Sequence, residues 1–511
     1  MTERQAPRLF AWLLWLALAG LCVAALGPSY INHDAAWYLY MVERWRDGAT
    51  LYRDVIDTNP PLIIWLSAPP VLAARALGVP HPALFKVYVL LLAAWSCAIA
   101  LRAIRRSWPA LTFPVFSAVV FAALPFVKQD FGQREHLALL LTLPYLFMAA
   151  SDARAPAWER LTTGVGAGLG FAIKPHFLAA WLVVEVAALV ARGARSWIRM
   201  ELVAAAATIA AYGVAVLVFV PQYLPVLAEV REVYGGLNAP VSALIRLPEV
   251  QIWIGAAALA ASFRWGRDGR LPLMLFAAAT GFVLAALLQM KGWSYHLYPA
   301  RALLLLFFVA ATSVILDRAP QFVALLRGGL TGLATVFAAV LAVSSARYVL
   351  EARHPAAPDL VTPLVDAIRR DAPEGPLAVL STATFVYPAF PAVNYTHARW
   401  GLRQNSVLFL EALYAGEEGP GGVAPPHPVA AMRPTERALF HELTDDLCRT
   451  PPRLLLVDAV DPRSRSTRRT FDVVAYVRQD ARVAALLEHY RAQETIGRFS
   501  VLVPDGPLEC R

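Results

Sequence analysis

Apolar runs of about 20 residues recur along most of this chain, and they constrain its fold more than any other feature. A helix needs roughly 20 mostly apolar residues to cross a bilayer. The first run, Leu9 to Gly27, is longer than the roughly 7–15-residue apolar core of a signal peptide. The whole chain is 58% hydrophobic and 16% charged, whereas soluble domains average about 45–50% and about 25%. The sequence therefore predicts a polytopic membrane protein whose first run is a transmembrane helix.

Arginine clusters between the apolar runs predict how the spans are oriented. Cytoplasmic loops are enriched in Lys and Arg, and Arg4 and Arg8 precede the first run, which indicates a cytoplasmic N-terminus. The later clusters also fall on the cytoplasmic side if the short, proline-containing segment 61–78 is an interfacial helix. This interpretation predicts about eleven spans, the last at 328–348. A full span at 61–78 is the alternative, and it would invert everything downstream.

The net charge of +9 comes mostly from these clusters, so we attribute it to membrane topology. No basic stripe is interleaved with stacking aromatic residues, and we expect no nucleic-acid partner. A glycine-rich run at 164–170 lacks the GK[ST] of a phosphate-binding loop. Close packing between spans through small residues is the better interpretation of that run.

The character of the chain changes after about residue 350, where polar and apolar residues mix as in a soluble domain. "PLAVLST" and "RLLLVDAV" are typical of short buried strands, "FDVVAYVRQDARVAALLEHYRAQ" of an amphipathic helix, and "IGRFSVLVP" of a closing strand. We expect a transmembrane domain at 1–350, with a first external loop at 28–82 that contains interfacial helices. An extracytoplasmic α/β domain should follow at 351–511.

The four cysteines show none of the CxxC spacing of zinc ribbons and redox motifs. Cys22 and Cys97 lie in predicted spans and are interpreted as small apolar fillers. Cys448 and Cys510 belong to the external domain, whose compartment permits disulfides, and we predict a bridge between them. Two unpaired thiols are the alternative, because spacing alone cannot show that the Cα atoms approach within about 7 Å.

Four polar islands fall on the predicted extracytoplasmic side, at 32–59, 128–136, 174–176 and 291–299. Ionisable groups near a membrane are costly, so they are functional candidates by default. Together these islands supply carboxylates, lysine, arginine, histidine and tyrosine. Such a set can bind a negatively charged lipid head group and provide a base.

Asp34 opens the first island, in "NHDAAWYLYMVERW". If Asn32 caps a helix, Asp34 lies in its first turn, where the helix dipole favours an anion. The residues that then share its helix face are Trp37, Tyr38, Met41 and Trp45. Such a face suits a helix that lies on a bilayer, and a purely helix-stabilising role for Asp34 is the alternative to a functional one.

The first island resembles the first external loop of GT-C glycosyltransferases, in the branch that contains protein O-mannosyltransferases and the lipid A aminoarabinose transferase. The matching elements are Asp34, Trp37-Tyr38, Gly48 to Tyr52 and the "PPL" at 60–62; Lys291, Tyr295 and Pro299 match the later lipid-phosphate element. The resemblance covers about residues 10–350. The second loop, "FGQREHL", departs from the simpler Asp-containing form of the family, and either Asp130 or Glu135 fits its acidic position.

The resemblance implies a membrane glycosyltransferase that moves a sugar from a polyprenyl-phosphate carrier to an acceptor hydroxyl on the extracytoplasmic side. The acceptor would be a glycan, a lipid or a protein. Because the leaving phosphate is already stable as an anion, one base suffices, and the catalytic candidates are Asp34 and Glu135. Cations should hold the phosphate charge. The substrate-binding candidates are Lys174, Lys291, Tyr295, His296, Arg134 and Tyr52.

No metal site is predicted, because His33 and His136 are isolated in the sequence. The lipid-linked sugar is the one expected donor, and a divalent metal stays an option as a cofactor. We expect a multi-pass protein of a bacterial inner or cell membrane, with membrane lipids as further partners.

Simpler interpretations of the charged residues stay open. Arg134 and Glu135 could form an interfacial ion pair, Lys174 could be a snorkelling lysine at a helix break, and Lys291 could belong to an aromatic-belt anchor. Two other functions are also open. A transporter or flippase of lipid-linked sugars would favour broken helices and acidic groups near the midplane. A non-catalytic envelope-assembly protein would keep the fold and lose Asp34 from the site.

Overall fold

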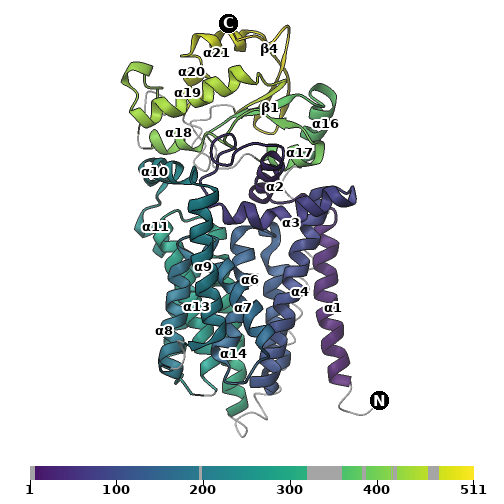
Figure 1. Cartoon of the computed structure of the whole chain (residues 1–511), viewed down its shortest axis with the longest axis vertical. Coiled ribbons are helices and arrows are strands. Elements are labelled where there is room, and N and C mark those ends of the chain that lie inside the picture. Colours follow the sequence, from purple (N-terminus) through teal and green to yellow (C-terminus); the bar gives the residue numbers. More distant parts are fainter. Residues whose placement is uncertain are drawn as a thin grey trace. The chain divides into compact units, whose positions relative to one another are not determined.

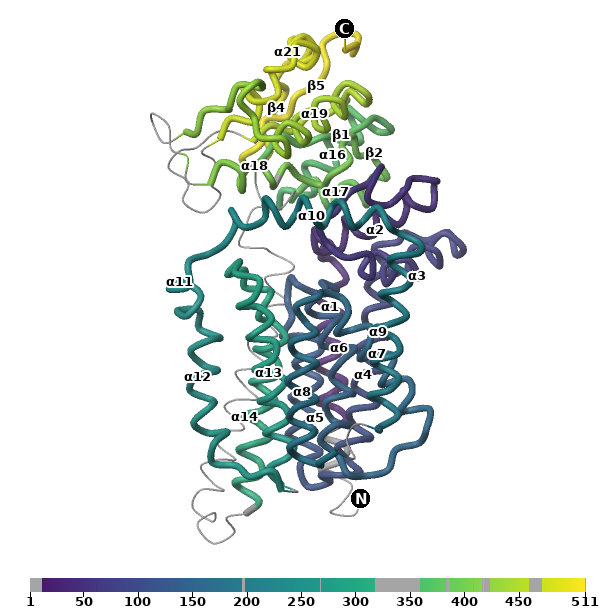
Figure 2. The backbone as a smooth tube through the Cα atoms, turned by 60° about the vertical axis from the view of Figure 1, so that its left-hand side comes forward, coloured from purple at the N-terminus to yellow at the C-terminus, as the bar shows by residue number. Residues whose placement is uncertain are grey.

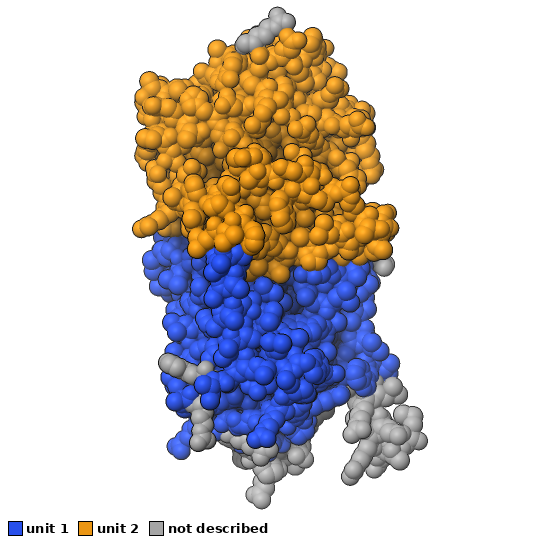
Figure 3. All heavy atoms as spheres, viewed as in Figure 1, with its two compact units in different colours: residues 1–29, 86–215, 239–356 blue, residues 30–85, 216–238, 357–511 orange. Residues whose placement is uncertain are grey.

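The structure, a computed structural model, divides the chain into two compact units (Figure 3). Unit 1 comprises residues 1–29, 86–215 and 239–356, and unit 2 comprises residues 30–85, 216–238 and 357–511. The residues that the structure describes are 6–194, 198–266, 268–318, 359–382, 387–415, 417, 423–458 and 471–510. The predicted eleventh span, 328–348, and the predicted boundary at 350 lie outside the described residues. The predicted first loop falls in unit 2 with the C-terminal segment, whereas we expected it to belong to the transmembrane domain.

Long apolar helices make up unit 1, and Figure 1 shows them running side by side. They are α1 (Ala6–Leu26), α4 (His81–Ser107, its first residues in unit 2), α5 (Thr112–Ala123), α6 (Arg134–Ala150), α7 (Ala157–Ala172), α8 (Phe177–Arg192), α9 (Met200–Phe219), α12 (Pro248–Ala261), α13 (Arg270–Gln289) and α14 (Tyr298–Arg318). Shorter elements join them, namely η1 (Pro109–Leu111), η2 (Pro125–Asp130), α11 (Val241–Ile245) and η5 (Ser294–Leu297). Figure 2 shows the same arrangement from a second direction.

Five helical stretches among the described residues are long and apolar enough to cross a membrane. They are His81–Ser107, Pro109–Asp130, Met200–Phe219, Arg270–Gln289 and Ser294–Asp317. Leu62–Leu77, the segment that we expect to be interfacial, is a shorter apolar helix. The protein is therefore a helical membrane protein, and the count of eleven spans stays a prediction.

The glycine-rich run lies on α7 and brings that helix close to its neighbours. A Cβ atom at Gly164 would lie 2.4 Å from the carbonyl oxygen of Glu201, and one at Gly168 would lie 2.6 Å from Cβ of Thr208, both on α9. Gly170 is equally close to Thr142 of α6. The expected small-residue packing between helices is confirmed, because no larger side chain fits at these positions.

Unit 2 combines helices with a five-stranded sheet. Its helices are α2 (His33–Arg46), α3 (Leu62–Leu77), α10 (Tyr223–Val233), η4 (Tyr234–Leu237), α16 (Val361–Asp371), α17 (Ala389–Thr396), α18 (Leu408–Leu413), η7 (Val429–Ala431), α19 (Pro434–Arg449), α20 (Val473–Val477) and α21 (Ala481–Glu488). Its strands are β1 (Pro376–Leu380), β2 (Arg399–Trp400), β3 (Leu454–Asp458), β4 (Tyr490–Ile496) and β5 (Phe499–Pro504). The strand order is β2-β1-β3-β5-β4, parallel from β2 to β3 and antiparallel at β5 and β4.

The three strands predicted from the sequence are present as β1, β3 and β5. Leu377 pairs with Leu454, and Leu455 pairs with Leu502, so the apolar runs form the middle of the sheet. The predicted single helix over 471–493 is wrong. Asp480 ends the first part and caps α21 by accepting a hydrogen bond from the backbone N–H of Arg482, at 2.9 Å. The last residues of that segment belong to β4 instead.

The aromatic face of α2 packs against protein, which corrects the expectation that it lies on a bilayer. Trp37, Tyr38 and Met41 are at most 2% exposed. The Trp37 ring meets the Phe390 ring of α17 edge to face, with ring centroids 5.2 Å apart. Only Trp45, at 44% exposed, is open among the residues predicted for this face. An amphipathic pattern cannot show whether lipid or a distant part of the chain covers the apolar side.

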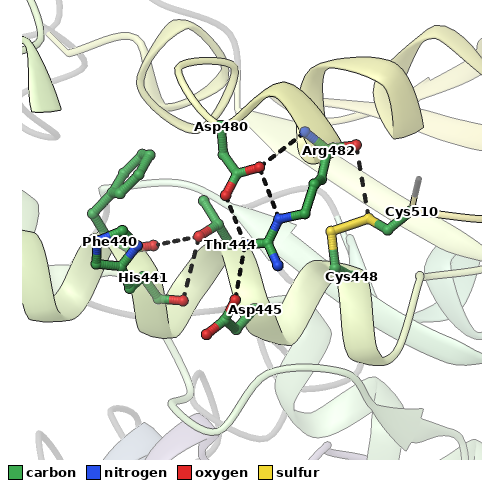
Figure 4. Close-up of a disulfide and its surroundings, with 8 residues drawn as sticks. All are labelled: Phe440, His441, Thr444, Asp445, Cys448, Asp480, Arg482 and Cys510. Atoms are coloured by element: carbon green, nitrogen blue, oxygen red, sulfur yellow. Dashed lines mark hydrogen bonds and ion pairs between the residues drawn. A yellow bond between two sulfur atoms is a disulfide. The ribbon is translucent and has the colours of Figure 1, made fainter.

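A disulfide joins Cys448 of α19 to Cys510, with Cα atoms 5.3 Å apart (Figure 4). This is the pairing predicted from the sequence. Arg482 lies beside it and donates hydrogen bonds to Asp445 of α19, at 2.9 Å, and to Asp480, at 2.7 Å. The bridge and these ion pairs attach the end of the chain and α21 to α19, and a terminus would otherwise fray.

Candidate functional site

Buried charges gather in unit 1 where three pairs of helices are joined. Arg134 and Glu135 begin α6, and Lys174 lies in the turn between α7 and α8. Lys291, Tyr295 and His296 lie between the end of α13 and the start of α14. We call these six residues the Lys174 cluster. Its four charged members and His296 are at most 6% exposed.

Local sequence places each of these residues at a helix end. Pro175 follows Lys174 and disfavours helical backbone there, so α7 stops and α8 begins at Phe177. Met290 and Gly292 both adopt left-handed backbone, with φ of 56° and 66°. They turn the chain on either side of Lys291, and α14 then starts with Pro299 at its second position, where proline fits a helix.

An ion pair forms the centre of the cluster. Nζ of Lys174 lies 2.5 Å from Oε1 of Glu135 and 3.3 Å from Oε1 of Gln289. Nε2 of His296 lies 4.0 Å from the same Glu135 oxygen. Among the described residues, Oε2 of Glu135 and Nδ1 of His296 are buried and have no hydrogen-bond partner. Unsatisfied buried polar atoms are uncommon and call for an explanation, such as a ligand.

Cations outnumber carboxylates in this cluster. Three of its members, Arg134, Lys174 and Lys291, are cations, and all three act electrostatically on His296. Its one carboxylate is Glu135, which pairs with Lys174. Lys174 also lies 5.6 Å from the centre of the Tyr295 ring, within cation–π range. Burial lowers the pKa of Lys291 to about 8, because the charged form is poorly solvated there. A cluster with this imbalance attracts an anion.

These contacts decide between the interpretations that the sequence leaves open. Lys174 is not a snorkelling lysine, because it is 5% exposed and its ammonium group binds Glu135. Glu135 forms its ion pair with a residue 39 positions away, and an additional pair with the neighbouring Arg134 stays open. Lys291 is buried rather than extended along a surface. Of the two acidic residues considered for the second loop, the cluster contains Glu135.

Asp34 occupies the first turn of α2 in unit 2, as the sequence predicts. The side chain of Asn32 caps this helix by accepting a hydrogen bond from the Asp34 N–H at 2.9 Å. Oδ1 of Asp34 lies 3.4 Å from Nε2 of His33. The Asp34 side chain keeps 18% of its surface exposed. The carboxylate is therefore held at a helix N-terminus and stays accessible.

A hydrogen-bonded network fixes the segment that follows α2. Asp57 is 7% exposed and accepts hydrogen bonds from Nε1 of Trp37, at 2.8 Å, and from the backbone N–H of Asn59, at 2.6 Å. Nδ2 of Asn59 donates to the Tyr38 hydroxyl at 3.2 Å. The Tyr52 hydroxyl donates to the carbonyl of Asn59 at 2.6 Å. The network ties the aromatic side of α2 to the residues just before the PPL element.

Tyr52, a predicted substrate-binding residue, is packed inside unit 2. It is 4% exposed, and its ring lies 5.0 Å from the ring of Tyr223. Its hydroxyl is used by Asn59, as described above. These contacts position the loop, and substrate binding by Tyr52 stays a prediction.

Sequence reasoning missed three residues of these two groups. Gln289 is the polar last residue of the apolar helix α13, and this isolated polar position was a usable signal. Asp57 and Asn59 stand in "DTNPPL", next to the prolines that match the family element. No local pattern indicates that Asp57 binds Trp37, because the contact spans 20 residues.

A histidine and carboxylate group in unit 2 was also missed. Glu43, His81 and His397 bring possible metal-ligand atoms within 4.8 Å of one another. Nδ1 of His81 lies 3.1 Å from Glu43, and its Nε2 lies 3.2 Å from Nδ2 of Asn394, an amide donor. Nε2 therefore accepts, and Nδ1 carries the proton toward Glu43. His81 is thus hydrogen-bonded on both ring nitrogens, to Glu43 and to Asn394, and its Nε2 lone pair is occupied by the Asn394 amide.

The two histidines judged isolated in the sequence have protein partners. His136 is buried, with Nδ1 accepting from the Gly132 N–H at 3.1 Å and Nε2 lying 2.8 Å from the Ala123 carbonyl. Both ring nitrogens of His136 therefore contact backbone groups of the segment between α5 and α6. His33 lies beside Asp34.

Comparison with solved structures shows which fold this is. The crystal structure of ArnT from Cupriavidus metallidurans in the apo state matches with a TM-score of 0.61 and 14% identity, over 97% of this chain and 98% of that chain. ArnT from the same organism bound to undecaprenyl phosphate matches with a TM-score of 0.59 and 14% identity, over 98% and 99%. The resemblance to GT-C glycosyltransferases is thereby confirmed at the level of the fold.

A mycobacterial arabinofuranosyltransferase, AftD, matches more distantly, with a TM-score of 0.45 and 15% identity over 98% of this chain and 40% of that chain. No protein-family model and no curated protein sequence matches the chain.

Proposed function

We propose that this protein is an integral-membrane glycosyltransferase. It takes a sugar from a polyprenyl-phosphate carrier and attaches it to an acceptor hydroxyl on the extracytoplasmic side of a bacterial membrane. The acceptor is a glycan, a lipid or a protein.

The Lys174 cluster is the observation that supports this proposal most strongly. It offers three cations to one carboxylate in a buried setting, and it stands on the fold of ArnT, which has been solved with undecaprenyl phosphate bound. A phosphate group would bring negative charge to this cationic cluster. It would also accept a hydrogen bond from Nδ1 of His296 when that nitrogen is protonated, a partner that the described residues do not provide. Buried cations aimed at an anion stabilise it more strongly than exposed ones, because little water screens them.

The reaction needs one proton acceptor and one stabilised leaving group. The acceptor oxygen attacks the anomeric carbon, the bond from that carbon to the phosphate oxygen breaks, and the acceptor proton passes to the base. We assign the base to Asp34, because it is a carboxylate held at a helix N-terminus and is still accessible. Lys174, Arg134 and Lys291 bind the phosphate and hold the negative charge that it carries away.

Glu135 receives a supporting role in this scheme. Its Oε1 is bound to Lys174, so the carboxylate orients the lysine and limits the charge of the empty cluster. Tyr295 supports Lys174 from the other side through its ring. Both residues act through Lys174 rather than on the sugar.

A transporter of lipid-linked sugars is the main competitor, and product analysis separates the two. The protein, purified and reconstituted in nanodiscs, is incubated with a labelled polyprenyl-phosphate sugar and an extract of envelope glycans and lipids. A transferase converts the donor to free polyprenyl phosphate and labels an acceptor. A transporter leaves the donor intact, and that outcome would sink the proposal.

Cell-envelope mass spectrometry identifies the acceptor. Cells with the wild-type protein, without the protein, and with the Asp34→Asn variant are compared at matched expression. We expect one sugar modification to disappear in both altered strains. An unchanged envelope in the strain that lacks the protein would contradict transfer to an envelope component.

A further inference from the structure

A second cationic pocket lies at the opposite ends of the helices that carry the Lys174 cluster. The first turn of α6 contains Glu135, and α6 ends at Ala150. α7 begins at Ala157, and its C-terminal end leads to Lys174. The pocket lies where α6 ends, α7 begins, α8 ends and α9 begins. Its volume is about 330 Å³, and its arginines are Arg106, Arg154, Arg160, Arg192 and Arg199. We call it the arginine pocket.

Carboxylates neutralise the arginine pocket only in part. Arg106 pairs with Glu159 at 2.5 Å, Arg160 with Glu201 at 2.9 Å, and Arg199 with Glu185 at 2.7 Å. The remaining lining carboxylate, Asp152, is 66% exposed and lies 3.8 Å from Arg192; Arg270 pairs with it as well. Among the described residues, five arginines line the pocket, and Arg102 and Arg270 share two of the four carboxylates that pair with them. The pocket therefore has an excess of positive charge.

Some buried guanidinium N–H groups of the pocket have no acceptor within hydrogen-bond distance among the described residues, although Oε1 of Glu201 lies 3.7 Å from Nε of Arg199. Arg199 is 6% exposed, and its Nε and Nη1 have no hydrogen-bond partner among the described residues. Nε of Arg192 is also buried and without one in that part of the chain. A buried guanidinium N–H that loses water and gains no acceptor is destabilising. An oxyanion in the pocket would satisfy these donors, and arginine forks match phosphate well.

Two helix N-termini add to this preference. Arg154 lies just before α7, and Arg199 directly precedes α9. The N-terminal ends of these helices, of 16 and 20 residues, carry partial positive charge and free N–H groups. The field of the backbone therefore has the same sign as the arginines.

Exposed apolar side chains flank the lining arginines in the sequence. They are Leu161 next to Arg160, Ile198 and Met200 next to Arg199, and Val190 two residues before Arg192. Ile198 is 81% exposed, and Val190 is 60% exposed. In a membrane protein, exposed apolar side chains on helix ends are suited to contact acyl chains. A free inorganic anion would make no use of them.

We propose that the arginine pocket binds the phosphate-bearing head group of an anionic phospholipid, with the acyl chains against exposed apolar side chains of α7, α8 and α9. Arginine marks the cytoplasmic side of membrane proteins, and basic pockets between membrane helices on that side suit anionic head groups. The occupant belongs to the surrounding bilayer. It is distinct from the sugar donor, because the pocket and the Lys174 cluster lie at opposite ends of α6, α7 and α8.

The test uses purified full-length protein in neutral detergent, titrated with phosphatidylglycerol, phosphatidylcholine or inorganic phosphate. Thermal unfolding and native mass spectrometry report binding. In the Arg154→Gln/Arg192→Lys variant, the first change removes one positive charge, and the second keeps the charge but removes the guanidinium group. The buried Arg199–Glu185 pair stays intact. Arg105→Gln is the matched control, because Arg105 is an exposed arginine on the last turn of α4 that does not line the pocket.

We expect phosphatidylglycerol to raise the unfolding temperature and to stay bound in the mass spectrometer, while phosphatidylcholine does neither. Each lost arginine charge should weaken binding on the order of fivefold, and the Arg105→Gln control should bind as the wild type does. Arg154→Gln alone is measured as well, in case the double variant does not fold. Equal binding by the variants and the wild type would overturn the proposal. An equal effect of inorganic phosphate would overturn the assignment to a lipid.

Discussion

The Lys174 cluster of unit 1 and the Asp34 end of α2 in unit 2 differ in how far their charged groups are buried and in what surrounds them. The cluster buries three cations around one carboxylate, and its central ion pair is almost closed to water. Asp34 is a single carboxylate with 18% of its surface exposed, held by an uncharged cap. The neighbouring network of Trp37, Asp57 and Asn59 fixes the segment that follows the helix.

The difference matches two tasks in one reaction. A group that stabilises a leaving phosphate works best when it is permanently charged and desolvated, because the local dielectric then strengthens its field. A group that accepts a proton must be reached by the acceptor and must exchange protons readily. We therefore expect changes at Asp34 to affect turnover, and changes in the Lys174 cluster to affect donor binding and stability.

The largest effect is expected at Asp34. Asp34→Asn should lower the rate of transfer by about 10²–10⁴-fold, because an amide cannot take the acceptor proton. Donor affinity and unfolding temperature should change little, since the Asn32 cap is retained. Transfer is measured as release of polyprenyl phosphate. Asp47→Asn, at the other end of α2, is the control with the same chemical change. Near-normal transfer by Asp34→Asn would remove this residue from the mechanism.

Lys174→Gln should be the next most severe change. It leaves Glu135 buried without its partner, and breaking such a pair typically lowers the free energy of unfolding by about 3–5 kcal/mol. The double variant Glu135→Gln/Lys174→Gln should recover much of this stability and still bind the donor poorly. Calorimetry and donor titration measure the two effects, with the exposed Lys128→Gln as the control. Normal donor affinity in the double variant would show that the pair is only structural.

Asp57 tests whether the network positions the base. Asp57→Asn replaces one acceptor oxygen by an amide that faces a donor, so about 1.5–3 kcal/mol of stability should be lost. We expect a smaller fall in transfer than at Asp34, with the donor affinity retained. Trp37→Phe removes one of the donors to Asp57 and should reproduce part of the effect. If Asp57→Asn weakened donor binding instead, the division of tasks between the two regions would be wrong.

The smallest effect is a pH dependence of donor affinity. Burial lowers the pKa of Lys291 to about 8, so its positive charge is present below that pH and is lost above it. Donor affinity should therefore fall severalfold between pH 7 and pH 9. Lys291→Arg should flatten this dependence, because arginine stays charged. Binding isotherms at both pH values give the result, and an equal fall in the arginine variant would point to another group.

Part of this site was predictable because charged residues cost free energy in or near a membrane segment. Asp34 at the head of an aromatic helix, and two lysines in an arginine-rich chain, are visible as exceptions to their surroundings. The helix cap at Asn32 and the three strands of unit 2 also follow from local sequence, because caps and alternating apolar runs act over a few residues. The Cys448–Cys510 pair followed from there being two cysteines outside the spans.

Other features depend on contacts between distant residues. The aromatic face of α2 fits either lipid or protein, and Phe390, more than 350 residues away, covers it. The single helix expected over 471–493 breaks at Asp480, because that residue caps a new helix and the following segment pairs with β5.

The sequence by itself determined that this is a helical membrane protein with polar islands, and which residues in those islands are chemically unusual. Hydrophobic length and composition are properties of single segments, so they can be read without a fold. The tertiary structure decided the partners: Glu135 with Lys174, Asp57 with Trp37, and the grouping of five arginines around one pocket. These pairings are set by which helix ends meet, and the free energy of a buried charge depends on its neighbours rather than on its own segment.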